Sequence, residues 1–265
     1  MRPTARLYLD DGDLLRTPAT VIAVGDDAVA FDRTCFYPGG GGQPPDAGVA
    51  TMGQAESPGV DDSGAATALE ITTVRGDREG VFWHVTSEPP QADLLGRPAD
   101  LQVDARRRRA LTRAHTALHV LDTIALRDYG AWITGVQIGA EQSRIDLTLA
   151  VFSPELVADL EAKTNAVLAA DHPVRTTYLP ESEFREREDL LRTLEARPPV
   201  LDGRVRVVTI VGFDAQACGG THVHSTAEVG RLVVVRTENK GRQNKRLYVR
   251  VEPPARVGAP RTECR

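Results

Sequence analysis

The 265-residue chain has few cysteines, namely Cys35, Cys218 and Cys264. Three cysteines are too few for a disulfide framework, and an odd count with one cysteine beside a histidine favours a metal thiolate in a reducing compartment. The chain also lacks any apolar run close to the ~20 residues that cross a membrane, and residues 1–4 lack the apolar core of a signal peptide. We therefore expect a cytoplasmic protein that does not enter a membrane.

An excess of positive charge is absent as well. The net charge is −5 and the hydrophobic content is 41%, as in ordinary globular proteins. The net charge of the whole chain therefore does not indicate a nucleic-acid-binding protein.

What the chain does contain is two pairs of residues that bind zinc in proteins. His115 and His119 are four positions apart in a segment that reads as a helix, so both imidazoles can share one face. Cys218 and His222 have the same spacing, and the two glycines between them suit a turn that folds the histidine back. Because the two pairs are far apart in sequence, one zinc would join distant parts of a large domain, which fits an enzyme better than a zinc finger.

Three kinds of zinc site compete on these residue types. A zinc peptidase would carry a glutamate general base after the first histidine, but this position is Thr116. A structural site, closed by one cysteine and three histidines, stays open. A hydrolytic site also stays open, in which zinc keeps one position for water and lowers the pKa of that water to roughly 7.

A second chemical segment is the glycine-rich stretch Gly39–Gly42, which prolines flank on both sides and Gln43 follows. Four consecutive glycines cost backbone entropy on ordering, so they make sense where a partner must approach the main chain closely. No Gly-Lys-Ser/Thr follows, which excludes a Walker loop. We expect an ordered loop that presents backbone amides and Gln43 to a ligand.

Two basic clusters flank the candidate zinc residues in sequence. A single cluster of this kind is usually only a solvated surface, but two of them predict a rim that faces phosphates. The clusters consist of 106–109 with Arg113 and of Lys240, Arg242, Lys245 and Arg246.

Hydrophobic patterning predicts an α+β protein. The first ~95 residues alternate short apolar runs with Gly, Asp and Pro, which indicates a small β-barrel or sandwich. A long helix is expected to start after Asp104 and end at Gly130, and a second to run from Ser153-Pro154 to about residue 170. A charged surface helix is expected over 181–194. The predicted strands are 5–9, 20–24, 28–31, 69–74, 81–85, 144–150, 174–178, 204–211, 231–237 and 247–251.

These elements predict two domains and a tail. Residues 1–95 form a small β-barrel-like domain with the glycine-rich loop, and 96–252 form a two-layer α/β domain that contains zinc. Residues 253–265 are expected to be a flexible tail, and 52–68 a surface excursion.

Four motifs follow one another between about residue 30 and residue 250. They are Thr34 with 36–44, the helical segment 115–119, the segment 214–222 with 228–230, and the basic segment 238–246. In this order they resemble AlaX, the free-standing alanyl-tRNA editing proteins that are related to the editing domain of alanyl-tRNA synthetase. The β-rich N-terminal part is similar to that of the medium-length class, and the chain contains no synthetase catalytic domain.

The resemblance implies an enzyme that acts in trans on mischarged alanine tRNA. It would hydrolyse the ester that joins serine, chiefly, or glycine to the acceptor end of that tRNA. The resemblance implies one zinc per chain, held by His115, His119 and Cys218, with His222 as a fourth ligand or a partner of the bound water. Whether zinc acts as a Lewis acid or only positions the tRNA end stays open.

The resemblance also implies roles for the remaining site residues. Gln43 and Gly39–Gly42 would line the pocket, and Thr34 would present its hydroxyl to the serine side chain. The expected tRNA contacts are Arg107, Arg108, Lys240, Arg242, Lys245 and Arg246. Two alternatives are a zinc-stabilised RNA-binding module without catalysis and an editor of serine on threonine tRNA; the Gln43 loop argues against the second.

Overall fold

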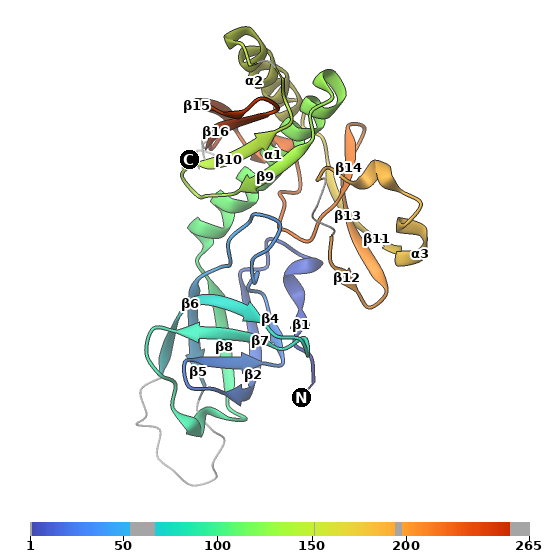
Figure 1. Cartoon of the computed structure of the whole chain (residues 1–265). Coiled ribbons are helices and arrows are strands. Elements are labelled where there is room, and N and C mark those ends of the chain that lie inside the picture. The colour runs from blue at the N-terminus through green and yellow to red at the C-terminus, as the bar shows by residue number, and fades with distance from the viewer. Residues whose placement is uncertain (1, 54–66, 151, 194–197, 255–265) are drawn as a thin grey trace, which may run out of the picture.

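A computed structural model of the chain describes residues 2–53, 67–150, 152–193 and 198–254. The chain folds as α+β, with a closed six-stranded barrel near the N-terminus and further sheets and helices beyond it (Figure 1). The α+β class and the N-terminal barrel are thus confirmed. No helix among the described residues is long and apolar enough to cross a membrane.

The barrel closes through antiparallel pairing in the order β2-β3-β7-β6-β5-β8. Burial alternates along β2, so that every second side chain faces the interior. The last strand, β8, lies beyond the expected boundary at residue 95 and closes the barrel by pairing with both β2 and β5. The strands are β2 (Arg16–Val24), β3 (Ala28–Phe31), β5 (Gly48–Met52), β6 (Ala68–Gly76), β7 (Phe82–Thr86) and β8 (Pro98–Val103).

A short strand and a 3-10 turn precede the barrel strands in the chain. Strand β1 (Ala5–Arg6) pairs in parallel with β4 (Arg33–Thr34), and a 3-10 turn follows at Leu7–Leu9. The predicted strand at 5–9 therefore covers only two strand residues.

Helix α1 (Ala105–Tyr129) has the predicted ends. The Asp104 side chain accepts hydrogen bonds from the backbone N–H groups of Arg106 and Arg107, and Gly130 ends the helix in the left-handed conformation at φ 64°. The helix runs from the barrel into the other half of the molecule (Figure 1). Helix α1 therefore connects the two regions, and His115 and His119 are part of it.

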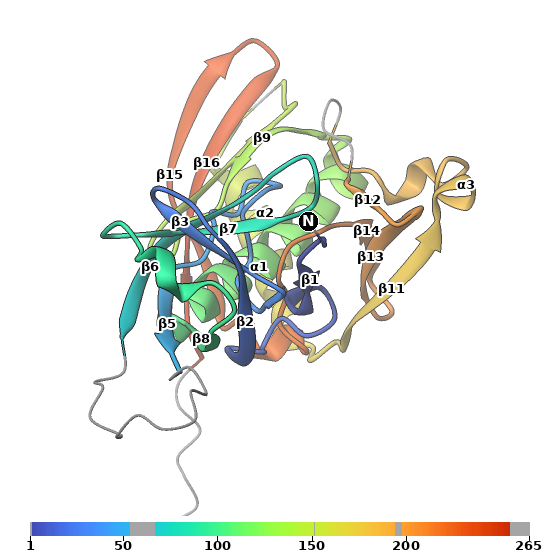
Figure 2. The same ribbon diagram turned by 90° about the horizontal axis from the view of Figure 1, so that it is seen from below.

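Helix α1 packs with helix α2 (Pro154–Ala169) on a sheet of order β15-β16-β10-β9. This is the predicted two-layer packing of helices on a sheet, and Ser153 caps α2 as expected. The β15–β16 hairpin projects beyond the remaining strands (Figure 2). The strands are β15 (Arg231–Gly241), β16 (Asn244–Glu252), β10 (Ser143–Leu147) and β9 (Ile133–Gln137).

A second sheet lies beside this pair of layers. Its strands are β11 (Val174–Pro180), β13 (Arg204–Ile210) and β12 (Val200–Leu201), with β14 (Asp214–Ala217) paired to β13. The predicted helix over 181–194 is wrong in its described part, which holds one turn, α3 (Glu181–Phe184), and 3-10 residues at Glu188–Leu190. This segment has too few apolar positions to bury a long helical stripe.

Two other predictions fall mostly on undescribed parts of the chain. Most of the surface excursion expected at 52–68 and most of the expected tail lie outside the described residues.

A short 3-10 turn, Thr226–Glu228, follows the segment that contains Cys218 and His222. Ser225 and Glu228 form a capping box at this turn.

Candidate metal centre and cavity

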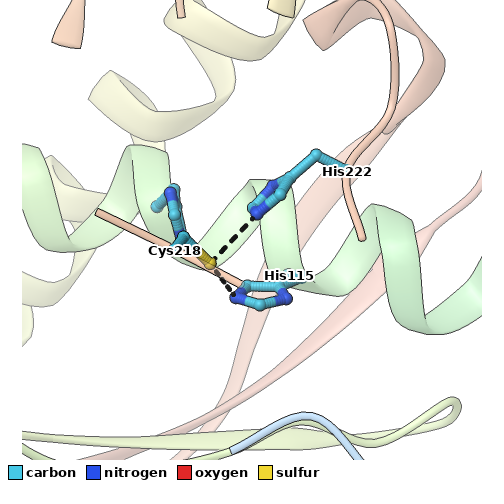
Figure 3. Close-up of side chains that lie close together, drawn as sticks. His115, Cys218 and His222 are labelled. Carbon is cyan, nitrogen blue, oxygen red and sulfur yellow. Dashed lines mark hydrogen bonds between the residues drawn. The ribbon is translucent and has the colours of Figure 1, made fainter. Parts of the chain in front are cut away.

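Helix α1 and the segment after β14 bring the two predicted pairs together. The ligand atoms of His115, His119, Cys218 and His222 all lie within 4.8 Å of one another. The Cys218 Sγ lies 3.5 Å from His115 Nε2 and 3.4 Å from His222 Nε2 (Figure 3). These four residues could therefore hold one metal ion between them.

Burial sets the protonation of these groups. Burial, with Arg206 nearby, lowers the pKa of His115 to about 3, and burial also lowers the pKa values of His119 and His222 well below the usual range. Burial raises the pKa of the Cys218 thiol. Neutral imidazole is the form that binds metals, and a metal ion would favour loss of the thiol proton.

Gln43 acts on the centre through His115. Its Oε1 lies 2.7 Å from His115 Nδ1 and accepts from the Thr221 backbone N–H at 3.1 Å, while its Nε2 donates to Thr221 Oγ1 at 2.9 Å. Because Oε1 can only accept, Nδ1 carries the proton and Nε2 is free for a metal. The side chain is buried and does not line the cavity, which corrects the prediction that Gln43 faces the ligand.

Thr116 orients His222, a role that the sequence did not reveal. Its hydroxyl donates to the Thr112 carbonyl at 3.1 Å and lies 3.1 Å from His222 Nδ1. The hydroxyl proton is thus used on the helix, so the oxygen accepts from His222 Nδ1–H. The residue that replaces a peptidase's glutamate is a positioning group for His222.

The glycines at the site are required by close approach. A Cβ at Gly220 would lie 2.1 Å from His115 Cε1, so only glycine lets the turn pass beside this imidazole. A Cβ at Gly42 would lie 2.6 Å from Val136 Cγ1, and Gly42 O accepts from Ile138 N–H at 2.8 Å. The end of the glycine-rich loop at Gly42 therefore packs against β9, while Gly40 and Gly41 are exposed.

A cavity of about 460 Å³ opens over the candidate centre. Its wall includes His115, His119 and Cys218 as well as Gly39, Gly40 and Gly41, but neither Gly42 nor His222. Apolar side chains such as Ile133 and Val136 provide much of the remaining wall. The volume and the mixture of an apolar lining with a few polar groups are typical of a small-molecule site.

Thr34 lies elsewhere, inside the barrel region. It is fully buried, its Oγ1 lies 2.8 Å from His84 Nε2, and it accepts from the Phe36 backbone N–H at 3.0 Å. Thr34 does not line the cavity. The structure therefore corrects the prediction that this hydroxyl meets a serine substrate, because the chain turns Thr34 inward before the glycine-rich loop begins.

Among the basic residues of α1, Arg108 is buried. Its side chain is 1% exposed, forms an ion pair with Asp46, and donates at 2.6 Å to the carbonyls of both Gly12 and Cys35. The prediction that Arg108 contacts tRNA is wrong, because one side of a helix must face the core and a run of arginines does not show which side chain that is. Arg107 is half-buried and donates to the Pro45 carbonyl at 3.2 Å.

The second basic cluster is divided in the same way. Lys245 is buried, with its Nζ donating to Asn239 Oδ1 at 3.1 Å and to the Gly241 carbonyl at 2.6 Å. Arg246 is mostly buried and forms a two-pronged ion pair with Asp146. Lys245 is therefore not available to a phosphate, which corrects that prediction, whereas the predicted tRNA contact of Arg246 stays a prediction. Lys240 and Arg242 are exposed at the end of the β15–β16 hairpin.

Asp122 is a cavity residue that sequence reasoning missed. It lies three positions after His119 and thus on the same face of α1, and it forms part of the cavity wall. Burial raises the pKa of this carboxyl well above its usual range, while Arg192 acts in the opposite direction. The helical spacing from His119 was the available signal.

The fold and the site together define a protein with a candidate metal centre at the wall of a small-molecule cavity. Residues 205–248 match the family model described as the threonyl and alanyl tRNA synthetase second additional domain. The chain is 35% identical to the alanyl-tRNA editing protein AlaX-M of Methanosarcina barkeri, over 92% of this chain and 98% of that protein.

Other relatives agree with this likeness. The AlaX-M protein of Saccharolobus solfataricus is 30% identical over 94% of this chain and 100% of that protein. The alanine–tRNA ligase of Korarchaeum cryptofilum is 37% identical over 88% of this chain, which is 25% of the ligase. The chain belongs to the AlaX-M family of alanyl-tRNA editing proteins, as its motifs predicted.

Proposed function

We propose that this protein is a trans-editing enzyme that hydrolyses the ester of mischarged alanine tRNA, chiefly seryl and also glycyl esters, with the help of one zinc ion. Its family makes it an aminoacyl-tRNA hydrolase. The observation that carries the proposal is the convergence of His115, His119, Cys218 and His222 beside one cavity. The acceptor end of the tRNA would enter this cavity.

The four donors fit zinc. Imidazole nitrogens and a thiolate sulfur are ligand atoms that zinc binds, four of them suit its tetrahedral coordination, and the lowered pKa values keep the imidazoles neutral. Gln43 and Thr116 each hold the Nδ1 of one histidine, which leaves the Nε2 atoms of His115 and His222 facing Cys218. Such outer hydrogen bonds are a usual feature of zinc sites.

The chain's own groups would prepare the ester for hydrolysis. When bound, zinc supplies Lewis acidity next to the substrate. Gln43 and Thr116 keep two ligands oriented, and Gly39–Gly41 leave space for the acyl group to approach the main chain. The apolar wall at Ile133 and Val136 limits bulk water, which strengthens electrostatic contacts with the substrate.

A deacylation assay tests the proposal. Alanine tRNA charged with serine, glycine or alanine is incubated with the purified protein, with and without a zinc chelator. We expect serine to be released faster than alanine and the chelator to stop the release. Zinc at full occupancy without release of any amino acid would instead indicate a zinc-stabilised RNA-binding module. Release of serine from threonine tRNA as fast as from alanine tRNA would indicate an editor of serine on threonine tRNA.

A further inference from the structure

The cavity wall contains three charged side chains, Arg6, Asp122 and Arg192, of which Asp122 is the one acid among the described lining residues. Arg192 is already neutralised, because its guanidinium lies 2.5 Å from an oxygen of Asp214. Arg192 also donates to backbone carbonyls at 2.6 and 2.9 Å. The carboxyl of Asp122 forms no ion pair within 4.0 Å among the described residues.

Only one oxygen of Asp122 is engaged. Its Oδ1 accepts from Gln216 Nε2 at 2.7 Å and from Thr123 Oγ1 at 3.3 Å. Oδ2 accepts no hydrogen bond from a described residue. It is also not fully enclosed, so part of its surface is accessible. Asp122 is 3% exposed, so the space that Oδ2 can meet is the cavity. Burial raises the pKa of this carboxyl, and a cationic ligand at Oδ2 would favour its ionised form, so the group is open to such a ligand.

The position of Asp122 relates this carboxylate to the reacting bond. Three residues advance a helix by about 4.5 Å, so Asp122 and the candidate ligand His119 lie one above the other on the same face of α1. In an aminoacyl ester, the α-ammonium group is attached to the carbon next to the ester carbonyl. A carbonyl at the metal centre would therefore bring the ammonium group within reach of a carboxylate one turn away.

We propose that Asp122 binds the α-ammonium group of the aminoacyl ester and so restricts the enzyme to tRNA esters with a free α-amino group. The inference rests on the proposed ester hydrolysis and adds the substrate class. Esters whose amino group is replaced or blocked, including peptidyl esters, leave the buried carboxylate without its partner. Asp122 thereby serves as a specificity residue beside the candidate metal centre.

The test separates charge from structure by Asp122→Asn. Asparagine keeps an oxygen that can accept from Gln216, while it loses the negative charge. Asp128→Asn is the matched control, because Asp128 is on the same helix but outside the cavity wall and pairs with Lys163. Zinc content and thermal stability of each variant show whether the site is intact.

Each protein is given two esters of alanine tRNA, the seryl ester and its analogue with a hydroxyl in place of the α-amino group. Rates are divided by those without enzyme, and kcat and KM are measured separately. We expect wild type and Asp128→Asn to prefer the amino ester by about 10- to 100-fold, the usual range for a hydrogen bond to a charged group. Asp122→Asn should reduce that preference to near unity, with zinc retained.

The outcomes are distinguishable. An unchanged preference in Asp122→Asn overturns the ammonium contact, and so does an equal loss of activity on both esters. If wild type, loaded with zinc, cleaves neither ester, the proposed hydrolytic function itself fails. Loss of zinc in Asp122→Asn would show a structural role for the carboxyl, and the proposal would then be wrong.

Discussion

The barrel and the candidate metal centre both contain buried histidines, but the groups around these histidines differ. In the barrel, His84 lies against the rings of Phe31 and Phe36, and its Nε2 meets the hydroxyl of Thr34. At the centre, three imidazoles and one thiol converge within 4.8 Å. A hydroxyl satisfies a single imidazole nitrogen, whereas converging lone pairs are satisfied together by a cation. Burial alone therefore does not make a histidine a metal ligand; the surrounding donors do.

The largest expected effect distinguishes these two environments directly. Cys218→Ala removes the thiolate, so the zinc content should fall from about one ion per chain to almost none, and seryl ester hydrolysis should stop with it. His84→Gln, at the buried histidine of the barrel, should keep its zinc. Metal analysis of the purified proteins and a deacylation assay measure both quantities. Full zinc and activity in Cys218→Ala would refute the assignment.

The next effect concerns the contact between the two regions. Gln43→Ala removes the acceptor that orients His115, so zinc affinity or activity should fall by about 10- to 100-fold. Gln43→Glu keeps an acceptor oxygen and should lose less. Competition with a chelating dye measures the affinity. If Gln43→Ala binds zinc as tightly as wild type, the hydrogen bond to His115 does not support the site.

The barrel and the metal centre should each contribute separately to the pH dependence of the free energy of unfolding. In the zinc-free protein, burial lowers the pKa of His84 to about 4, while the unfolded chain takes up this proton near pH 6.5. The free energy of unfolding therefore falls as the pH drops below about 6.5, by about 1.4 kcal/mol per pH unit for this one group. His84→Gln should remove that part of the slope.

The histidines of the metal centre should retain their own share of this slope, because their pKa values are lowered by burial as well. Urea unfolding of zinc-free wild type and His84→Gln, between about pH 7 and about pH 5, gives the two slopes. Identical slopes would mean that the pKa of His84 is the same in the folded and the unfolded protein.

The smallest effect is expected at the surface. Replacing both Lys240 and Arg242 by alanine should weaken tRNA binding and reduce the salt dependence by about one phosphate contact per residue. Arg16→Ala is the control, because Arg16 is an exposed arginine of the barrel that pairs with Asp100. Binding measured over a series of salt concentrations shows the slopes. Equal slopes in all three proteins would place the hairpin outside the tRNA contact.

Local patterns determined much of the site from sequence. The spacing of His115 and His119 fixes both on one helix face, and the glycines between Cys218 and His222 allow a turn past His115. The ends of α1 also follow from local chemistry, since Asp104 caps the first turn and Gly130 takes the left-handed conformation. Such features depend on residues only a few positions apart, which the sequence shows directly.

Only the tertiary structure decided contacts between residues that are distant in sequence. Gln43 meets His115 across 72 positions, and Thr34 faces His84 in the barrel rather than the cavity. Packing likewise turned Arg108 inward to Asp46, although its arginine neighbours look the same in sequence. The reason is that a side chain's partner depends on how whole elements pack, and a local pattern fixes only which residues share a turn or a face.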